Sequence, residues 1–216
     1  MDTVYYVIDF FVSGGLFMYP ILMVFAVGVA IAIERYVTLS RITVRNQQAW
    51  NKLEEALVAG DFEKARTLSH EDDSAIAKLL AMGLDRQGAV RRREDIETAM
   101  EEQMMEIIPQ LEKRTPYIAL GANIATLLGL LGTIMGLITA FEAVANANPA
   151  EKADLLSASI SVAMNTTAFG LIVAIPLLIT NQVLLAKASA IIDSLEMASV
   201  KALNVISANA KRRVEA

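Results

Sequence analysis

Three long stretches without a charged side chain constrain the fold of this chain more than any other feature. They cover residues 16–33, 116–141 and 155–186, and none contains Asp, Glu, Lys or Arg. About 20 predominantly apolar residues in a helix cross the hydrocarbon core of a bilayer. Because lipid offers the backbone no hydrogen-bond partners, each stretch is predicted to be an α-helix. We therefore expect an all-α membrane protein with three transmembrane helices, at 16–35, 116–141 and 155–186.

The composition agrees with a membrane location and excludes several chemistries. Hydrophobic residues make up 55% of the chain, and the formal net charge of -5 argues against a nucleic-acid partner. The chain has no cysteine, which excludes disulfides, thiolate metal sites and cysteine nucleophiles. Its one histidine, His70, is expected on a solvated loop, because one imidazole cannot complete a metal site. No nucleotide-binding or hydrolase motif is present, so we expect no enzyme, no cofactor and no bound metal.

The distribution of basic residues predicts how the chain lies in the membrane. All but one of the 19 lysines and arginines, the exception being Lys152, fall in 35–115 or after residue 186. The positive-inside rule then places 36–115, as a helical domain, and 187–216, as a helix, on the cytoplasmic side. The loop 142–154 and the segment 1–15 are expected on the periplasmic side. Aromatic residues over 4–12 predict an interfacial helix within that segment.

Helical patterns recur through the predicted cytoplasmic domain. Apolar residues before and after Gly60 and Asp61 repeat at helical spacing, which predicts a hairpin with a C′ glycine and an N-cap aspartate. A further helix is predicted over 74–85. Another is predicted over 94–115, leading straight into the second span with kinks at Pro109 and Pro116. Its glutamates fit either a cation antenna or a solvated face, and the solvated face is favoured. Glu34 and Arg35 are expected to form a local ion pair at the headgroups.

Small and hydroxyl-bearing residues line one face of the second span and one face of the third. In the second span they recur at steps of three and four, and the third span does much the same. Small residues let membrane helices approach closely. The faces comprise Ala122, Thr126, Gly129, Thr133, Gly136 and Ala140, and Ser159, Ala163, Thr167, Gly170, Ala174, Leu177 and Asn181.

The polar residues of these faces admit two interpretations. They either form hydrogen bonds between helices or line a path for an ion, and spacing alone does not decide. The residues concerned are Asn123, Thr126, Thr133, Asn165, Thr166 and Thr167. No carboxylate, histidine or lysine lies within a span, whereas a proton-conducting site normally needs a titratable group. A proton channel built on this chain would therefore take its carboxylate from another subunit.

Two segments resemble the second and third spans of the ExbB and TolQ proteins, which are related to MotA. They are TPYIALGANIATLLGLLGTIMGLITAF and ISVAMNTTAFGLIVAIPLLITN, and IERYVTLSR after the first span is similar as well. The resemblance implies a homopentameric helical channel around two copies of an ExbD- or TolR-like subunit. That partner has a single span carrying an essential aspartate. The assembly would use the proton gradient to energise TonB- or TolA-like proteins that act on the outer membrane.

The resemblance also implies roles for particular residues. Thr133 and Thr167 would face the partner's aspartate. The wider ion pathway would include Thr126, Asn165 and Thr166, and the partner helix would pack against Gly129, Gly136, Ala163, Gly170 and Ala174. Val162 stands where ExbB and TolQ usually carry a glutamate, which puts a glutamate relay in doubt. A sodium-driven motor stays open because Asn165, Thr166 and Thr167 offer neutral oxygens.

Two other functions compete with the channel subunit. A non-conducting membrane scaffold would use the same small-residue faces. A small-solute transporter is disfavoured, because the sequence shows no internal repeat, no pair of broken helices and no substrate-binding charge.

Overall fold

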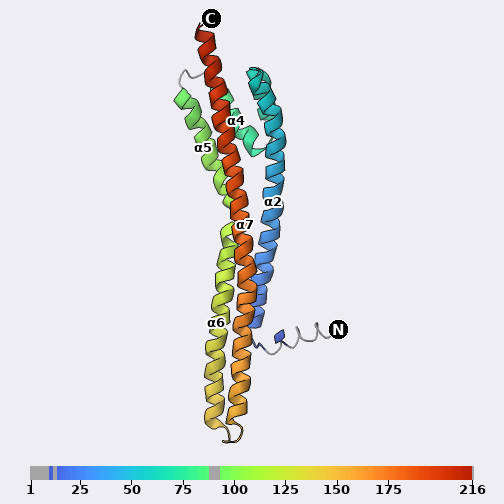
Figure 1. Ribbon diagram of the computed structural model, residues 1–216, viewed down its shortest axis with the longest axis vertical. Helices are drawn as coiled ribbons and strands as arrows, with labels where there is room; N and C mark the ends of the chain where they lie inside the picture. Colours follow the sequence, from blue (N-terminus) through green and yellow to red (C-terminus); the bar gives the residue numbers. More distant parts are fainter. Residues whose placement is uncertain (1–9, 12–13, 88–92, 216) are drawn as a thin grey trace, which may run out of the picture. The chain divides into compact units, whose positions relative to one another are not determined.

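The structure of the chain is a computed structural model that describes residues 10–11, 14–87 and 93–215. Within these residues every regular element is an α-helix (Figure 1). The helices are α2 (Met18–Val58), α3 (Phe62–Glu71), α4 (Ala75–Arg86), α5 (Arg93–Glu112), α6 (Thr115–Asn146) and α7 (Lys152–Glu215). Three helical stretches of the described chain are long and apolar enough to cross a membrane. The all-α class and the three spans are confirmed, while most of the predicted aromatic segment 4–12 lies outside the described residues.

The described residues form two compact units. The span unit combines residues up to 34 with 114–183, and the hairpin unit combines 35–113 with residues from 184 onward. The helices α2 and α7 contribute residues to both units. Each unit has its own packed interior.

The span unit consists of α6, the antiparallel start of α7 and the first part of α2. Leu177 of α7 packs against Gly28 of α2, where an added Cβ would lie 2.8 Å from the leucine Cδ2. The predicted loop 142–154 is helical at both ends, since α6 runs to Asn146 and α7 begins at Lys152. The stretches without charged residues therefore predicted where α6 and α7 are apolar. They did not predict where these helices end.

A two-residue break at 113–114 separates the helix predicted over 94–115 from the second span. The helix α5 ends at Glu112, and α6 begins at Thr115 after Arg114, whose φ of 67° is left-handed. Pro116 lies in the first turn of α6 and has no backbone N–H, so it cannot continue the hydrogen-bond ladder of α5. Pro109, by contrast, lies inside α5.

Hydrogen-bonding caps define the short helices of the hairpin unit. Gly60 has a φ of 75°, and the Asp61 side chain accepts from the Lys64 N–H at 3.1 Å, which confirms the predicted hairpin. At the start of α4 the Ser74 hydroxyl accepts from Ala77 N–H at 3.3 Å. The side-chain Oδ1 of Asn46 on α2 accepts from Ile76 N–H at 3.3 Å. Two backbone N–H groups in the first turn of α4, which have no acceptor within the helix, thereby gain hydrogen-bond partners.

His70 lies in the last turn of α3, so the predicted loop position is wrong. Its Nε2 is 3.0 Å from the Asp85 carboxylate of α4, and Arg66 Nε is 3.4 Å from the same oxygen. The side chain is largely exposed, as expected of a solvated residue. The helix begins after its N-cap Asp61 and runs from Phe62 to Glu71, so it includes His70.

Arg35 holds the end of α5. Its side chain is 3% exposed, and its guanidinium donates to the carbonyls of Leu111 and Gln110 in the last turn of that helix. A cation is favoured there because unpaired carbonyls give a helix C-terminus partial negative charge. Glu34 lies 3.7 Å from Arg114 within the span unit, and the expected local Glu34–Arg35 pair stays a prediction.

Replacing Arg35 by alanine is expected to destabilise the hairpin unit. The substitution leaves two carbonyls of a buried helix end without their donor, which costs about 1–3 kcal/mol. The thermal midpoint of the detergent-solubilised protein should fall, and α5 should become more sensitive to protease.

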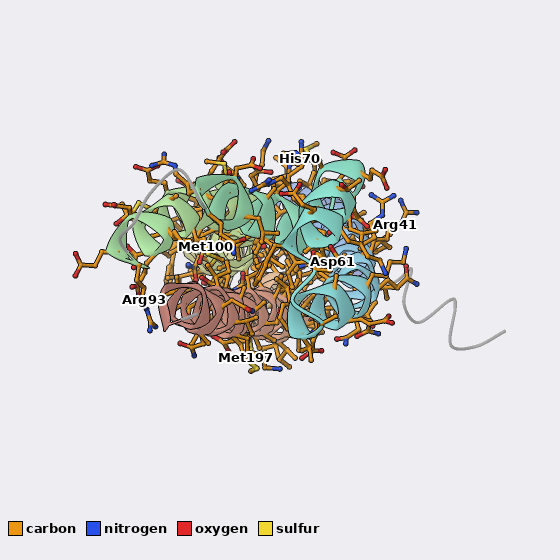
Figure 2. The ribbon with its side chains drawn as sticks, turned by 90° about the horizontal axis from the view of Figure 1, so that it is seen from above. Arg41, Asp61, His70, Arg93, Met100 and Met197 are labelled. Carbon is orange, nitrogen blue, oxygen red and sulfur yellow. The ribbon has the colours of Figure 1, made fainter. Side chains whose placement is uncertain are left out.

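Arg41→Ala is the matched control, because Arg41 projects from the outer side of α2 (Figure 2). An exposed substitution of this kind changes stability by no more than about 0.5 kcal/mol. Equal midpoints for Arg35→Ala and Arg41→Ala would contradict the role given to Arg35.

Candidate functional site

The helices α6 and α7 meet at a close contact between small residues, which we call the seam. A Cβ added to Gly170 would lie 2.7 Å from the Ala125 carbonyl oxygen, and one added to Gly129 would lie 3.2 Å from Thr167 Cα. At Gly136 an added Cβ would lie 2.8 Å from Ala163 Cβ. Backbone faces backbone at these positions, so side chains larger than hydrogen do not fit without a shift of the helices.

Two consecutive threonines of α7 form hydrogen bonds in different directions. Thr167 Oγ1 donates to the Gly129 carbonyl of α6 at 2.7 Å, directly across the seam. Thr166 is 2% exposed, and its hydroxyl lies 2.5 Å from the Gly14 carbonyl and 3.0 Å from the Val162 carbonyl. The first threonine therefore joins α6 to α7, and the second joins α7 to the residues before α2.

The seam has two edges, and the candidate threonines lie on one of them. Thr166 packs on Gly132, which also lies near Phe17, so this edge is covered by the start of the span unit. Successive helical residues are 100° apart, which puts Thr133 and Thr167 on the other edge. Thr126 lies two turns before Thr133 on the same edge.

The hydroxyls of this second edge keep acceptor capacity. Thr133 Oγ1 donates to the Leu130 carbonyl at 2.6 Å, and Thr126 Oγ1 donates to the Ala122 carbonyl at 3.1 Å. Thr167 is the third hydroxyl of this edge, and each of the three donates its proton to a carbonyl of the same chain. Each oxygen still has lone pairs for a further donor, such as a protonated carboxyl or a water.

Asn165 does not join this group. It is two positions before Thr167 on α7, which turns it about 160° away around the helix axis. Thr166 is directed to the covered edge. The three neutral oxygens considered for sodium therefore do not converge within one chain, because consecutive helical residues point in different directions.

The residues expected to receive a partner helix already have neighbours. Gly129, Gly136, Ala163 and Gly170 stand against the facing helix of the same chain, and Ala174 is buried. Their contact with a second protein stays a prediction. Sequence reasoning missed Gly132 as a seam residue and Gly14 as the partner of Thr166. Glycine spacing of three and four could have revealed Gly132, whereas nothing periodic marks Gly14.

Two further polar groups of the span unit are buried without a hydrogen-bond partner in the described chain. They are the Thr115 hydroxyl at the start of α6 and the side-chain Oδ1 of Asn181 on α7. Thr115 was not among the predicted site residues, since its position next to Pro116 reads as a helix start.

The span unit thus defines a multi-pass membrane protein with a hydroxyl-lined helix pair and no charged side chain in its apolar stretches. The model of the MotA/TolQ/ExbB proton channel family matches residues 71–197. The chain belongs to this family.

Similar proteins from other organisms have names of the same family. An ExbB-like biopolymer transport protein (ExbB-like 1) of Synechocystis is 29% identical over 192 residues, covering 86% of this chain and 73% of the relative. An ExbB homologue of Methanothermobacter thermautotrophicus is 28% identical over 193 residues, covering 88% of this chain and 67% of the relative. The Tol-Pal system protein TolQ of Haemophilus influenzae is 37% identical over 78 residues, covering 36% and 34% of the two chains.

Gly170→Ala is expected to loosen the α6–α7 pair. The new methyl group would press on the Ala125 carbonyl, a backbone atom that cannot turn aside, and overpacking of this kind costs about 1–3 kcal/mol. Unfolding of the purified protein in detergent would measure the loss.

Gly121→Ala provides the comparison, because a Cβ there would make only an ordinary 3.5 Å contact with Val24. Alanine has the higher helix propensity, so this variant should be as stable as the parent or slightly more stable. If both variants lose the same stability, the seam is not the tight contact described.

Proposed function

We propose that this chain is the channel subunit of an inner-membrane motor driven by the proton-motive force. The motor would energise TonB- or TolA-type proteins that act at the outer membrane. The observation that carries the proposal is the edge formed by Thr126, Thr133 and Thr167. It offers hydroxyl oxygens along the apolar stretches 116–141 and 155–186, which contain no carboxylate, histidine or lysine of their own.

A carboxylate from a partner subunit would complete such a pathway. An ionised carboxyl group is costly inside a membrane unless polar groups solvate it. The hydroxyls of Thr133 and Thr167 could accept from the carboxyl group when it is protonated, because their lone pairs are available. Val162 leaves this chain without the usual family glutamate, so the partner's aspartate becomes the group that titrates.

The family supports a partner of a defined kind. We propose an ExbD- or TolR-like subunit with one span and one membrane aspartate, enclosed by a homopentamer of this chain. Only 22% of the most apolar window in the first two candidate spans, and 33% in the third, is buried within the chain. The remaining apolar surface is available for lipid and for other subunits.

The energy available per proton sets what the motor can do. One elementary charge moved through 100 mV carries about 2.3 kcal/mol. That amount suffices to shift a helix between two packing arrangements. It is smaller than the total stability of a folded domain, about 5–15 kcal/mol. The seam would therefore stay intact while the partner moves against the threonine edge.

The proposed orientation follows the basic residues. The hairpin unit would lie in the cytoplasm, and the connection between α6 and α7 would face the periplasm.

Thr133→Val and Thr167→Val are expected to abolish proton flux while the protein still assembles. Valine keeps the shape of threonine and removes the oxygen. A hydrogen bond between membrane helices is worth about 0.6 kcal/mol on average, so losing the Thr167–Gly129 bond should not unfold the unit. Flux would be measured in proteoliposomes that contain the chain and its co-purified single-span partner.

Two variants test whether the hydroxyl itself matters. Thr167→Ser should keep most of the flux. Thr139→Val should have no effect, because that exposed threonine lies six positions after Thr133, about 120° around α6 and away from the threonine edge. Full activity in both Thr133→Val and Thr167→Val would leave a non-conducting scaffold as the better account.

A further inference from the structure

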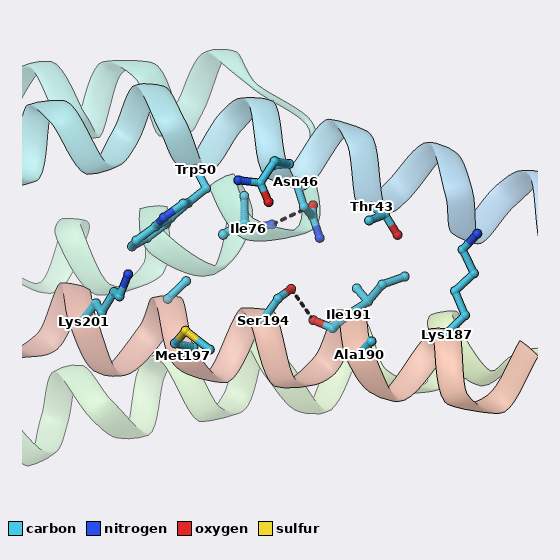
Figure 3. A pocket seen from close by; sticks show the side chains of 12 residues that line it. Thr43, Asn46, Trp50, Ile76, Lys187, Ala190, Ile191, Ser194, Met197 and Lys201 are labelled. Atoms are coloured by element: carbon cyan, nitrogen blue, oxygen red, sulfur yellow. Dashed lines mark hydrogen bonds between the residues drawn. The ribbon is translucent and has the colours of Figure 1, made fainter. Parts of the chain in front are cut away.

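The hairpin unit contains an open groove between α2 and α7 (Figure 3). It encloses a cavity of about 440 Å³, and Ile76 of α4 contributes to its lining. Its apolar lining comes mainly from Trp50, Ile76, Ala190, Ile191, Met197 and Ala198. Both long helices face this space without filling it, and none of its lining residues belongs to the span unit.

A lysine stands near each end of the groove. Lys187 Nζ donates to Ser40 Oγ at 2.6 Å and lies 4.2 Å from the Tyr36 ring centroid. Lys201 Nζ lies 3.3 Å from Glu54 and 5.4 Å from the Trp50 ring centroid. An ammonium group has three donors, so both lysines can bind a further acceptor. Fourteen positions separate them along α7, which is about 21 Å.

Asn46 gives the groove an unused donor. Its side chain is 4% exposed, and its Oδ1 is engaged by Ile76 N–H at 3.3 Å. Asn46 is among the residues that line the groove, and its buried Nδ2 has no partner in the described chain. Leaving such a donor unpaired costs about 1–3 kcal/mol. The groove is therefore complementary to an occupant that carries acceptors as well as apolar surface.

The outer face of α5 has the matching chemistry. Met105 is 72% exposed and lies among Glu101, Glu102 and Glu106. Glu97 and Glu112 are exposed on either side of it, 15 positions apart, which is about 22 Å along the helix. On α5, Met105 has one of these carboxylates on each side at a similar distance. In the groove, Ser194 lies midway between Lys187 and Lys201, so the two surfaces have matching spacing.

The α5 helix of the same chain cannot be this occupant. Its opposite face is already packed into the hairpin unit, where Met100 is buried and its sulfur lies 3.7 Å from the Ser199 hydroxyl of α7 (Figure 2). The acidic face with Met105 points away from that contact. A second copy of the chain can present this face while its own α5 stays in place.

We propose that the acidic face of α5 from one copy docks into the α2–α7 groove of the next copy. The Glu97 carboxylate pairs with Lys201, the Glu112 carboxylate pairs with Lys187, and Met105 enters the apolar centre. The two surfaces differ, so the contact is heterologous and repeats around a ring when its rotation closes. The inference rests on the self-association included in the proposed function and is independent of ion conduction.

Cysteine cross-linking tests the contact directly, because the chain has no cysteine of its own. Met105→Cys and Ser194→Cys combined in one full-length chain should give disulfide-linked dimers and higher multiples when membranes are oxidised. Met105→Cys combined with Thr67→Cys is the control. Thr67 is exposed and bonds to its own helix as Ser194 does, but it lies on α3. Equal ladders from both pairs, or none from the first, would overturn the proposal.

Charge reversal provides a second measurement on the same cysteine pair. Lys187→Glu with Lys201→Glu should lower the cross-linked fraction about tenfold, because carboxylates would then face carboxylates. Adding Glu97→Lys and Glu112→Lys should restore it. Failure of the fourfold variant to recover, while its span unit still folds, would show that a lipid or another protein fills the groove and would overturn the proposal.

The outcomes separate this contact from the ion pathway. Cross-links together with full proton flux in Thr133→Val and Thr167→Val would sustain the contact and overturn the pathway. Absent cross-links together with lost flux in those variants would overturn the contact and sustain the pathway.

Discussion

The approach of backbone to backbone between α6 and α7 is the contact on which the span unit depends. Gly129 and Gly170 allow it, and the Thr167 hydroxyl fastens it to the Gly129 carbonyl at 2.7 Å. In lipid this contact gains nothing from hydrophobic burial, so close packing and hydrogen bonds must hold the helices. The same geometry directs Thr166 to the residues before α2 and leaves Thr126, Thr133 and Thr167 on the other edge.

The two units divide the work of the chain. The span unit supplies apolar helices with a hydroxyl edge, and the hairpin unit supplies caps, ion pairs and a buried arginine that fix short helices against long ones. The span unit lacks a titratable group in its apolar stretches, and the hairpin unit leaves a groove with an unpaired Asn46 donor.

Sequence patterns predicted what depends on local chemistry and on periodicity. The three spans, the Gly60–Asp61 hairpin and the helix after Ser74 follow from charge-free length and capping residues, and the structure confirms them. Periodicity and capping residues do not predict contacts between segments that are distant in the sequence. Arg35 reaches the end of α5 across 76 positions of sequence, and the break at Arg114 needs a left-handed residue that no pattern signalled. The ion-pathway roles of the threonines stay predictions.

Proton flux through the purified chain, with and without its single-span partner, tests the central claim most directly. The account holds that this protein surrounds a titratable carboxyl group that it does not contain. Proteoliposomes with the chain alone should therefore show no flux above lipid under an imposed potential, and adding the partner should produce it. Flux through the chain alone, at the rate of the complex, would contradict the account.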